Sequence, residues 1–235
     1  MKISRVEKRF LLARPASRLT SALFLDRDGV IIEDRHYISN PAFVQLCSGA
    51  WQLIHHAMHA SWPVVVITNQ SGIARGLLSW QEFEAVTSRM LEMLGPKAPI
   101  AAIYANGHGP GAPPQSWRKP SPAMLYEAAG ELNLDLSRSI LIGDRLSDLR
   151  AGASAGLPML CHVLSGHGER ERPAVQRWCQ QLAQAAGTEF LPPASVHAGQ
   201  PVTASCLASD PSVLMLPNLN SFPLQLLASL PIDRS

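Results

Sequence analysis

Short apolar runs alternate with amphipathic stretches along most of the chain. The apolar runs are continuous, which is typical of parallel strands that helices cover on both faces. They predict strands at residues 22–25, 63–67, 100–104, 139–142, 159–163 and 213–216. Apolar residues at helical spacing predict helices at residues 48–60, 79–94, 122–132, 148–155, 173–186 and 221–230. Because strands and helices alternate, the chain is predicted to be an α/β protein with a doubly wound, mostly parallel, Rossmann-like sheet.

The composition is that of a folded protein, and it narrows the range of partners. The chain has 235 residues, of which 46% are hydrophobic and 16% are charged. Its 20 Lys and Arg against 18 Asp and Glu give a net charge of +2, which argues against nucleic acid as a partner. No apolar run reaches the roughly 18 residues that span a bilayer, so no membrane partner is expected. The four cysteines are scattered and form no CxxC pair, which favours a reducing cytoplasm.

Charged and hydroxyl side chains follow four of the predicted strands. In chain order they are Asp26-x-Asp28, Thr68-Asn69, Arg118-Lys119 and Gly143-Asp144-x-x-x-Asp148. Ligands of open α/β sheets bind where the carboxyl ends of the strands meet, so these groups are expected to converge on one edge. Carboxylates, a hydroxyl and a lysine at one edge suit attack on a phosphate monoester.

A divalent cation is expected at this edge, because a carboxylate and a phosphate repel each other. Like charges about 4 Å apart cost roughly 4 kcal/mol at an effective dielectric constant near 20. Mg²⁺ removes this cost, and it prefers carboxylate, water and phosphate oxygens. Asp26 and Asp144 are the expected side-chain ligands, and the backbone carbonyl of Asp28 is a further candidate. Asp26 is then the expected nucleophile, which forms an aspartyl-phosphate.

The remaining polar groups are expected to act around that nucleophile. Asp28 would protonate the leaving alcohol and then deprotonate the hydrolytic water. Thr68 and Lys119 would hold the transferring phosphoryl group and balance its charge. Asp148 is expected to orient Lys119 or a metal-bound water.

These blocks resemble the haloacid dehalogenase-like phosphatases, and within them the heptose 1,7-bisphosphate 7-phosphatase family. The resemblance rests on residues 24–31, 67–76, 118–120 and 143–144. It implies the haloacid dehalogenase fold without a large cap domain, and removal of the 7-phosphate of D-glycero-D-manno-heptose 1,7-bisphosphate for bacterial surface-polysaccharide synthesis. It implies Mg²⁺ ligands at Asp26, Asp28 and Asp144. It also implies substrate or phosphate contacts from Asp34, Arg35, His36, Tyr37, Thr68, Asn69, Gln70, Ser71, Arg118, Lys119 and Arg145.

The resemblance also suggests how the chain is organised. Residues 1–20 form a basic N-terminal extension, which is expected to be frayed. Residues 21–235 are expected to form one phosphatase domain. Within it, residues from about 167 to 210 are an insertion that precedes the last strand and helix. Arg145 stands where the family commonly has a lysine, so the charge is kept while the reach of the side chain changes.

The loop before Arg118 departs from the family. Relatives usually hold this loop with a zinc ion, through a Cys-x-His and a Cys-x-Cys pair. Here the corresponding positions are Asn106-Gly107-His108 and Gln115-Ser116-Trp117, so only the histidine remains. Since one imidazole cannot form a tetrahedral four-ligand site, no structural zinc is expected. Prolines or the packing of Trp117 are the candidates for holding the loop.

Three functions remain open at this point. The first is a cytoplasmic, monomeric, Mg²⁺-dependent phosphatase that acts on a small sugar phosphate. The second keeps the same chemistry but acts on histidinol phosphate or another small phosphate ester. The third is a catalytically silent phosphate-binding or regulatory protein, which the aspartates at both positions 26 and 28 disfavour.

Overall fold

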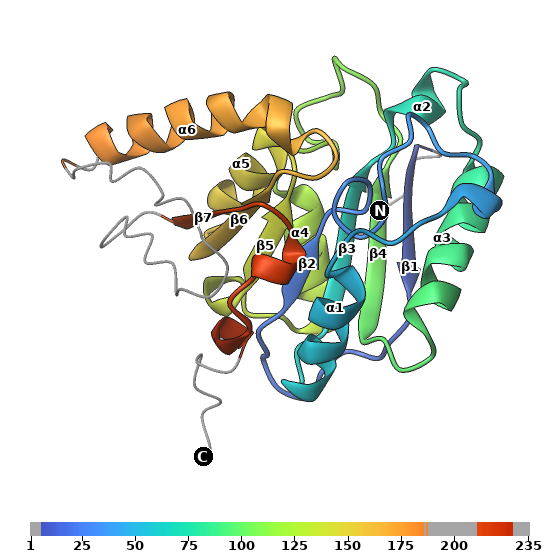
Figure 1. Ribbon diagram of the computed structural model, residues 1–235, viewed down its shortest axis with the longest axis horizontal. Coiled ribbons are helices and arrows are strands. Elements are labelled where there is room, and N and C mark those ends of the chain that lie inside the picture. Colours follow the sequence, from blue (N-terminus) through green and yellow to red (C-terminus); the bar gives the residue numbers. More distant parts are fainter. Residues whose placement is uncertain (1–5, 186, 188–210, 228–235) are drawn as a thin grey trace.

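A seven-stranded sheet forms the centre of the computed structural model, which describes residues 6–185, 187 and 211–227 (Figure 1). The strands lie in the order β1-β4-β3-β2-β5-β6-β7. Strand β1 runs antiparallel to β4, and all the other neighbours are parallel. The strands are Glu7–Leu11 (β1), Leu23–Leu25 (β2), Val64–Asn69 (β3), Ile100–Asn106 (β4), Ile140–Gly143 (β5), Met159–Val163 (β6) and Ser212–Leu216 (β7).

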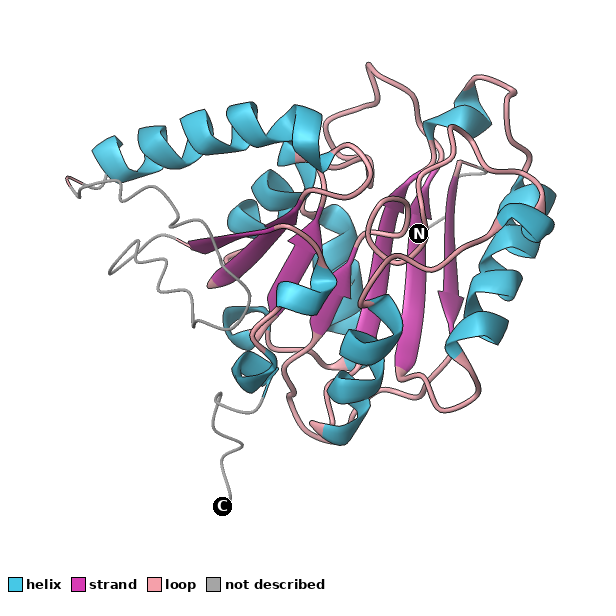
Figure 2. Ribbon diagram, viewed as in Figure 1, coloured by secondary structure: helices cyan, strands magenta, loops and turns pink. Residues whose placement is uncertain are grey.

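Helices cover both faces of the sheet, as Figure 2 shows. One core contains residues of α1 and α3, and the other contains residues of α4, α5 and α6. Strand side chains alternate between these cores: Leu23 and Leu25 belong to the first, and Phe24 to the second. The predicted doubly wound α/β sheet is therefore confirmed. The helices are Ala50–His59 (α1), Ser71–Ala74 (α2), Trp80–Leu94 (α3), Ala123–Leu132 (α4), Leu146–Ser154 (α5) and Gly168–Ala185 (α6), with 3₁₀ turns at Pro41–Phe43, Leu136–Arg138, Leu219–Ser221 and Leu224–Leu227.

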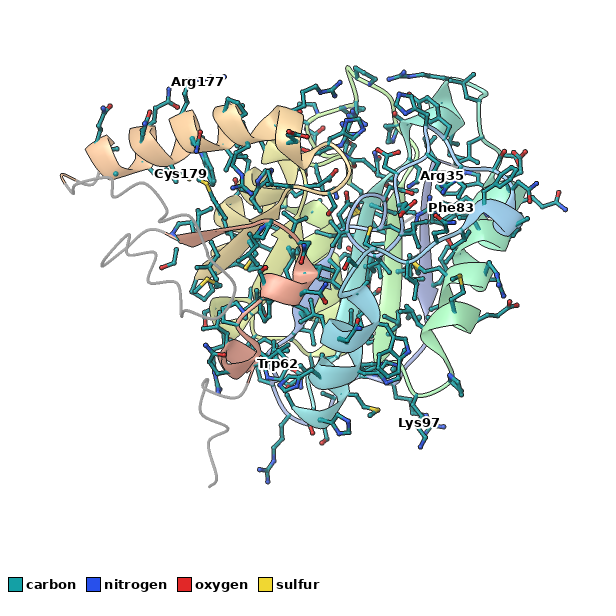
Figure 3. All side chains as sticks on the ribbon, viewed as in Figure 1. Arg35, Trp62, Phe83, Lys97, Arg177 and Cys179 are labelled. Carbon is teal, nitrogen blue, oxygen red and sulfur yellow. The ribbon has the colours of Figure 1, made fainter. Side chains whose placement is uncertain are left out.

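The order of the strands changes direction at β2. The chain passes from β2 to β3 and β4 on one side, and then returns to β5 on the other side of β2. Connections that leave in opposite directions open a crevice at the carboxyl end of the strand between them. In Figure 3, Trp62 and Lys97 lie toward the amino ends of the parallel strands, and Arg35 lies toward the other end. The residue that directly follows β2 at this crevice is Asp26.

Helix α3 begins where the capping pattern predicts. The Ser79 hydroxyl accepts a hydrogen bond from the Glu82 backbone N–H at 3.2 Å, and the Glu82 carboxylate accepts one from the Ser79 N–H at 2.8 Å. This reciprocal pair satisfies two backbone donors at the start of the helix. It fixes a helix whose buried Phe83 packs beneath the candidate site.

The expectation of a frayed N-terminal stretch is wrong for residues 7–11, which form the edge strand β1. Lys8 and Arg9 form ion pairs with acidic residues of α3 and α4, while Phe10 packs against Phe83. The apolar-run criterion misses this strand because an edge strand exposes one side to water and carries charged residues.

Two predicted helices near the C-terminus also differ from the structure. Helix α6 begins at residue 168 instead of about 173, because the loop after β6 turns directly into it. The predicted helix at 221–230 is replaced, as far as residue 227, by 3₁₀ turns on either side of Pro223, which lacks the N–H that a helix needs. Residues 228–230, and much of the predicted insertion at 167–210, lie outside the described residues.

None of the helices in the described ranges is long and apolar enough to cross a membrane.

Replacement of Leu141 tests the core beneath the site. This β5 side chain is fully buried, so Leu141→Ala is expected to lower the free energy of unfolding by about 2–5 kcal/mol. The matched control is Leu77→Ala, because Leu77 is 55% exposed, and its effect should stay within about 0.5 kcal/mol. Urea unfolding followed by circular dichroism measures both values. Equal losses for the two variants would contradict the assigned core.

Candidate active site

Three buried carboxylates meet at the crevice beside β2. Asp26 follows β2, Asp144 follows β5, and Asp148 lies in the first turn of α5. One carboxylate oxygen of each lies within 4.8 Å of the others, and each residue is at most 6% exposed. Buried carboxylates at this spacing repel one another strongly, so the structure needs positive charge among them.

Lys119 supplies that charge from the opposite side of the crevice. Its Nζ lies 3.0 Å from Asp26 and 2.8 Å from Asp148, and it also donates to the Ile67 carbonyl at 2.8 Å. Burial disfavours the charged ammonium, but the carboxylates of Asp148 and Asp26 outweigh burial and raise the pKa of Lys119. The predicted proximity of Lys119 to Asp148 is thus present in the structure.

Asn69 holds the backbone of Lys119 in place. The Asn69 side-chain amide donates to the Lys119 carbonyl at 3.1 Å and accepts from the Lys119 N–H at 3.1 Å. These paired bonds join the end of β3 to the end of the loop that follows β4. Asn69, which is predicted to contact phosphate, therefore positions the backbone of Lys119 in this structure.

The two carboxyl groups that follow the central strands β2 and β5 have raised pKa values. Burial, followed by the charges of Asp26 and Asp148, raises the pKa of Asp144 to about 8. Burial also raises the pKa of Asp26 to about 6, although the nearby Lys119 acts in the opposite direction. Burial is the main cause of both shifts, and the neighbouring carboxylates add to it.

The donor set fits a hard cation such as Mg²⁺. Asp144 Oδ1 is buried and has no hydrogen-bond partner, while Oδ2 accepts one bond from the His167 N–H at 2.7 Å. Oxygen ligands from carboxylates are those that Mg²⁺ prefers. The predicted side-chain ligands Asp26 and Asp144 belong to this cluster, whereas the Asp28 carboxylate accepts hydrogen bonds from Arg27 and Gln70.

Two glycines allow the chain to pack closely against Asp144. A Cβ on Gly29 would lie 2.6 Å from Asp144 Oδ2, and one on Gly166 would lie 2.4 Å from the same atom. Both residues also have positive φ angles, of 83° and 59°, which side chains rarely adopt. The glycine after the Asp-x-Asp pair is thus required both for the turn and for space.

The Asp28 carboxylate is held by Arg27 and Gln70. Arg27 donates to its two oxygens at 3.0 and 3.2 Å, and Gln70 donates to Oδ2 at 2.7 Å. Arg27 is almost completely buried, with its guanidinium 4.5 Å from the centre of the Phe83 ring and bonded to Thr87. The sequence prediction did not include Arg27; its place between the two aspartates was the available signal.

Two adjoining cavities open above the carboxylates, with volumes of about 320 and 340 Å³. Asp26, Lys119 and Asp148 line the second cavity. The first is strongly cationic, because five arginines line it. Burial, followed by the charges of Arg75 and Arg145, lowers the pKa of Arg118, as expected where cations are crowded together. The predicted residues that line one or both cavities are Asp26, Asp28, Asp34, His36, Tyr37, Asn69, Gln70, Ser71, Arg118, Lys119, Arg145 and Asp148.

Two predicted contact residues lie outside the cavity walls. Arg35 is exposed, and its guanidinium donates to Glu33 at 3.2 Å and Gln45 at 2.6 Å (Figure 3). Thr68 is buried, and its hydroxyl accepts from Gln70 at 2.8 Å.

The sequence prediction missed His167 and Arg170, which line the cationic cavity. His167 Nε2 lies 2.7 Å from Asp34, and its Nδ1 lies 3.0 Å from an Arg170 nitrogen. Burial, followed by the charge of Arg145, lowers the pKa of His167. These residues belong to the region interpreted as an insertion, and nothing in their spacing points to the site.

The loop before Arg118 is held by protein contacts. The Trp117 ring packs edge-on against Tyr104 at 5.5 Å, which agrees with the candidate role of that tryptophan. The Trp117 N–H also donates to the Glu7 carboxylate at 2.8 Å. Arg118 donates to the His108 carbonyl at 2.9 Å, so the loop is bonded across its base.

The fold and this site define a phosphatase of the HAD-like hydrolase class. A HAD-hydrolase-like family model matches residues 116–186. A D-glycero-β-D-manno-heptose-1,7-bisphosphate 7-phosphatase of Mesorhizobium japonicum is 48% identical over 143 residues, which are 58% of this chain and 66% of that protein. The corresponding α-anomer enzyme of Campylobacter jejuni is 39% identical over 61% of this chain and 83% of its own length.

A solved structure supports the same relationship. The D,D-heptose 1,7-bisphosphate phosphatase of B. bronchiseptica, complexed with magnesium and phosphate, superposes with a TM-score of 0.61 and 33% identity. The match covers 66% of this chain and 87% of that chain. The chain belongs to the heptose 1,7-bisphosphate 7-phosphatase family.

The raised pKa values of Asp26 and Asp144 predict that Mg²⁺ binding strengthens as the pH rises from 6 to 8. Both carboxyls must lose their protons to bind a cation, so binding is expected to release protons. Affinity should rise by up to about tenfold per pH unit for each proton released. Calorimetry in buffers of different ionisation enthalpy measures affinity and proton release together.

The partly buried acid Asp135, which caps a 3₁₀ turn, provides the control for this titration. Asp135→Asn should leave the pH profile of Mg²⁺ binding unchanged, because its carboxylate lies outside the acidic cluster and accepts hydrogen bonds from Ser137 within that turn. An affinity that is constant from pH 6 to 8 in the wild-type protein would contradict the assignment of these two ligands.

Proposed function

We propose that this protein is a Mg²⁺-dependent phosphatase that removes the 7-phosphate of D-glycero-D-manno-heptose 1,7-bisphosphate. The observation that carries the proposal is the contact of Lys119 with Asp26 and Asp148 at the strand crossover. That group combines a nucleophile, a buried cation and a metal-binding cluster within one crevice. The names of the two curated relatives support the choice of substrate.

Asp26 is the proposed nucleophile. Its carboxylate attacks phosphorus while the bond from phosphorus to the sugar oxygen breaks, and an aspartyl-phosphate results. Asp26 and Asp144 would hold Mg²⁺, with the Asp28 backbone carbonyl as a third ligand. When bound, Mg²⁺ supplies the positive charge that lets two anions approach each other. Lys119 holds the Asp26 carboxylate in place and balances the charge of the phosphoryl group.

Asp28 is the proposed general acid and base. It gives a proton to the leaving sugar oxygen, and then takes a proton from the water that attacks the aspartyl-phosphate. Arg27 and Gln70 bind its carboxylate, so they hold it in a fixed orientation for the proton transfer. Asp28 lines both cavities, which supports a position between the reacting phosphate and the rest of the substrate.

The cationic cavity supports a substrate with a second anionic group. Arg75, Arg118 and Arg145 share its wall, and their mutual repulsion would be relieved by a bound anion. Histidinol phosphate carries an ammonium group instead, which these arginines would repel. The bisphosphate is therefore the better match in charge.

The proposal extends to the setting of the enzyme. A cytoplasmic location is supported by Cys47 and Cys161, which are buried thiols and not disulfides. We further propose that the protein is a monomer. It needs no structural zinc, because Glu7, Tyr104 and Trp117 provide contacts for the loop before Arg118.

Asp26→Asn is the direct test of the mechanism. The variant is expected to keep its fold and lose all measurable turnover, because an amide cannot form the aspartyl-phosphate. Phosphate release is measured with and without Mg²⁺ from heptose 1,7-bisphosphate, histidinol phosphate and several hexose phosphates. Activity retained by the variant would refute the mechanism. A preference for another ester would change the assigned substrate and keep the mechanism. If the wild type turns over none of these compounds, the protein is better described as a phosphate-binding protein.

Arg27→Lys tests the positioning of Asp28. Lysine keeps the charge but loses the bidentate hydrogen bonds to the Asp28 carboxylate. We therefore expect kcat to fall by about 10²-fold with little change in KM. The matched control is Thr87→Val, which removes the other hydrogen bond of Arg27 and leaves the Asp28 contact. A kcat within about twofold of wild type for Arg27→Lys would show that Asp28 needs no such partner.

A further inference from the structure

Strand β1 lies directly beneath the loop that carries Arg118. Its register with β4 runs from Leu11 opposite Ala102 to Glu7 opposite Asn106, so Glu7 lies where β4 ends and the loop begins. One residue earlier, the Val6 carbonyl accepts a hydrogen bond from the Gly107 N–H at 2.6 Å. The N-terminal strand therefore continues its pairing into the first residue of the loop.

The Glu7 side chain contacts both arms of this loop. Its Oε1 accepts the Trp117 N–H at 2.8 Å, and the same oxygen lies 3.6 Å from His108 Nε2. The carboxylate is mostly shielded, with 15% of the side chain exposed. A single carboxylate thus joins the start of the loop to its end.

Both contacted residues determine where Arg118 lies. Trp117 immediately precedes Arg118 in the chain, and the His108 carbonyl accepts a hydrogen bond from the Arg118 guanidinium at 2.9 Å. Glu7 therefore holds the backbone next to Arg118, and it also contacts His108, the residue that binds the Arg118 side chain. Arg118 lines both cavities above the carboxylates.

We propose that Glu7 is a positioning residue for substrate binding, and that β1 is part of the apparatus that presents Arg118 to an anionic group of the substrate. The inference rests on the proposed function for the identity of that substrate. Its mechanical part, the contact of Glu7 with the loop, does not depend on it. Glu7 touches no reacting atom, so it acts on binding through Arg118 and leaves the chemical step to the aspartates.

The test compares Glu7→Ala, Glu7→Gln and the control Glu84→Ala with the wild-type protein. Glu7→Ala removes the acceptor, and it is expected to raise KM about tenfold while kcat changes by less than about twofold. Glu7→Gln keeps an oxygen that can accept the Trp117 N–H, so it should lie within about threefold of wild-type KM. Glu84→Ala breaks the Lys8 ion pair, another side-chain contact of β1, and should leave KM unchanged.

Hydrogen exchange of the peptide spanning residues 107–118 gives a second readout that requires no substrate. Exchange should be faster in Glu7→Ala than in wild type, and unchanged in Glu84→Ala. An unchanged KM in Glu7→Ala, equal effects of Glu7→Ala and Glu84→Ala, or unchanged exchange in this peptide would each overturn the proposal.

The two proposals fail in different ways. If the wild type hydrolyses another phosphate ester and not the bisphosphate, the proposed function fails, and the same variants are compared on that ester. If it hydrolyses none, hydrogen exchange alone decides whether Glu7 positions the loop.

Discussion

The site depends on how the fold tolerates several carboxylates in one buried crevice. Asp26, Asp144 and Asp148 come within a few ångströms of one another, where each pair of like charges costs roughly 4 kcal/mol at an effective dielectric constant near 20. Lys119 offsets part of this cost through its contacts with two of them. Burial, followed by the charges of Asp26 and Asp148, keeps the pKa of Asp144 high. The clustered carboxylate oxygens make the crevice a suitable site for a divalent cation and, with it, for a phosphate.

The surrounding structure keeps this unfavourable arrangement in place. The His162 ring nitrogen Nε2 contacts the Asp144 carbonyl at 3.0 Å, and Arg172 of α6 donates to the other ring nitrogen at 2.9 Å. Burial lowers the pKa of His162 to about 4, so its ring stays neutral and donates to that carbonyl. Gly29 and Gly166 leave room for the Asp144 side chain. The repulsion among the buried carboxylates thus lowers the stability of this end of the sheet, and packing in the two cores offsets that loss.

Substrate recognition is built separately from this chemistry. Asp26 and Asp144 directly follow the central strands β2 and β5, which are covered by helices on both faces, and Lys119 and Asp148 are held against them. The arginines lie on loops and at helix ends around the cationic cavity, where they can vary without disturbing the nucleophile. The loop of Arg118 has no helix or strand of its own, and its contacts with Glu7, Tyr104 and Asn106 replace regular structure.

Local sequence patterns were enough to predict the parallel sheet, the helices on both faces and the acidic and basic groups that follow the strands. Apolar runs and Asp-x-Asp spacing are local patterns, and the parallel topology brings the strand ends together whatever the details of packing. The contacts of Arg27, Glu7 and His167, in contrast, became visible only in the folded chain. Arg27 packs over an aromatic ring of α3, and Glu7 binds a loop more than a hundred positions later in the chain. His167 contacts an aspartate that follows β2. Such contacts join distant segments and leave no periodic trace in the chain, because each depends on where the backbone places a single side chain.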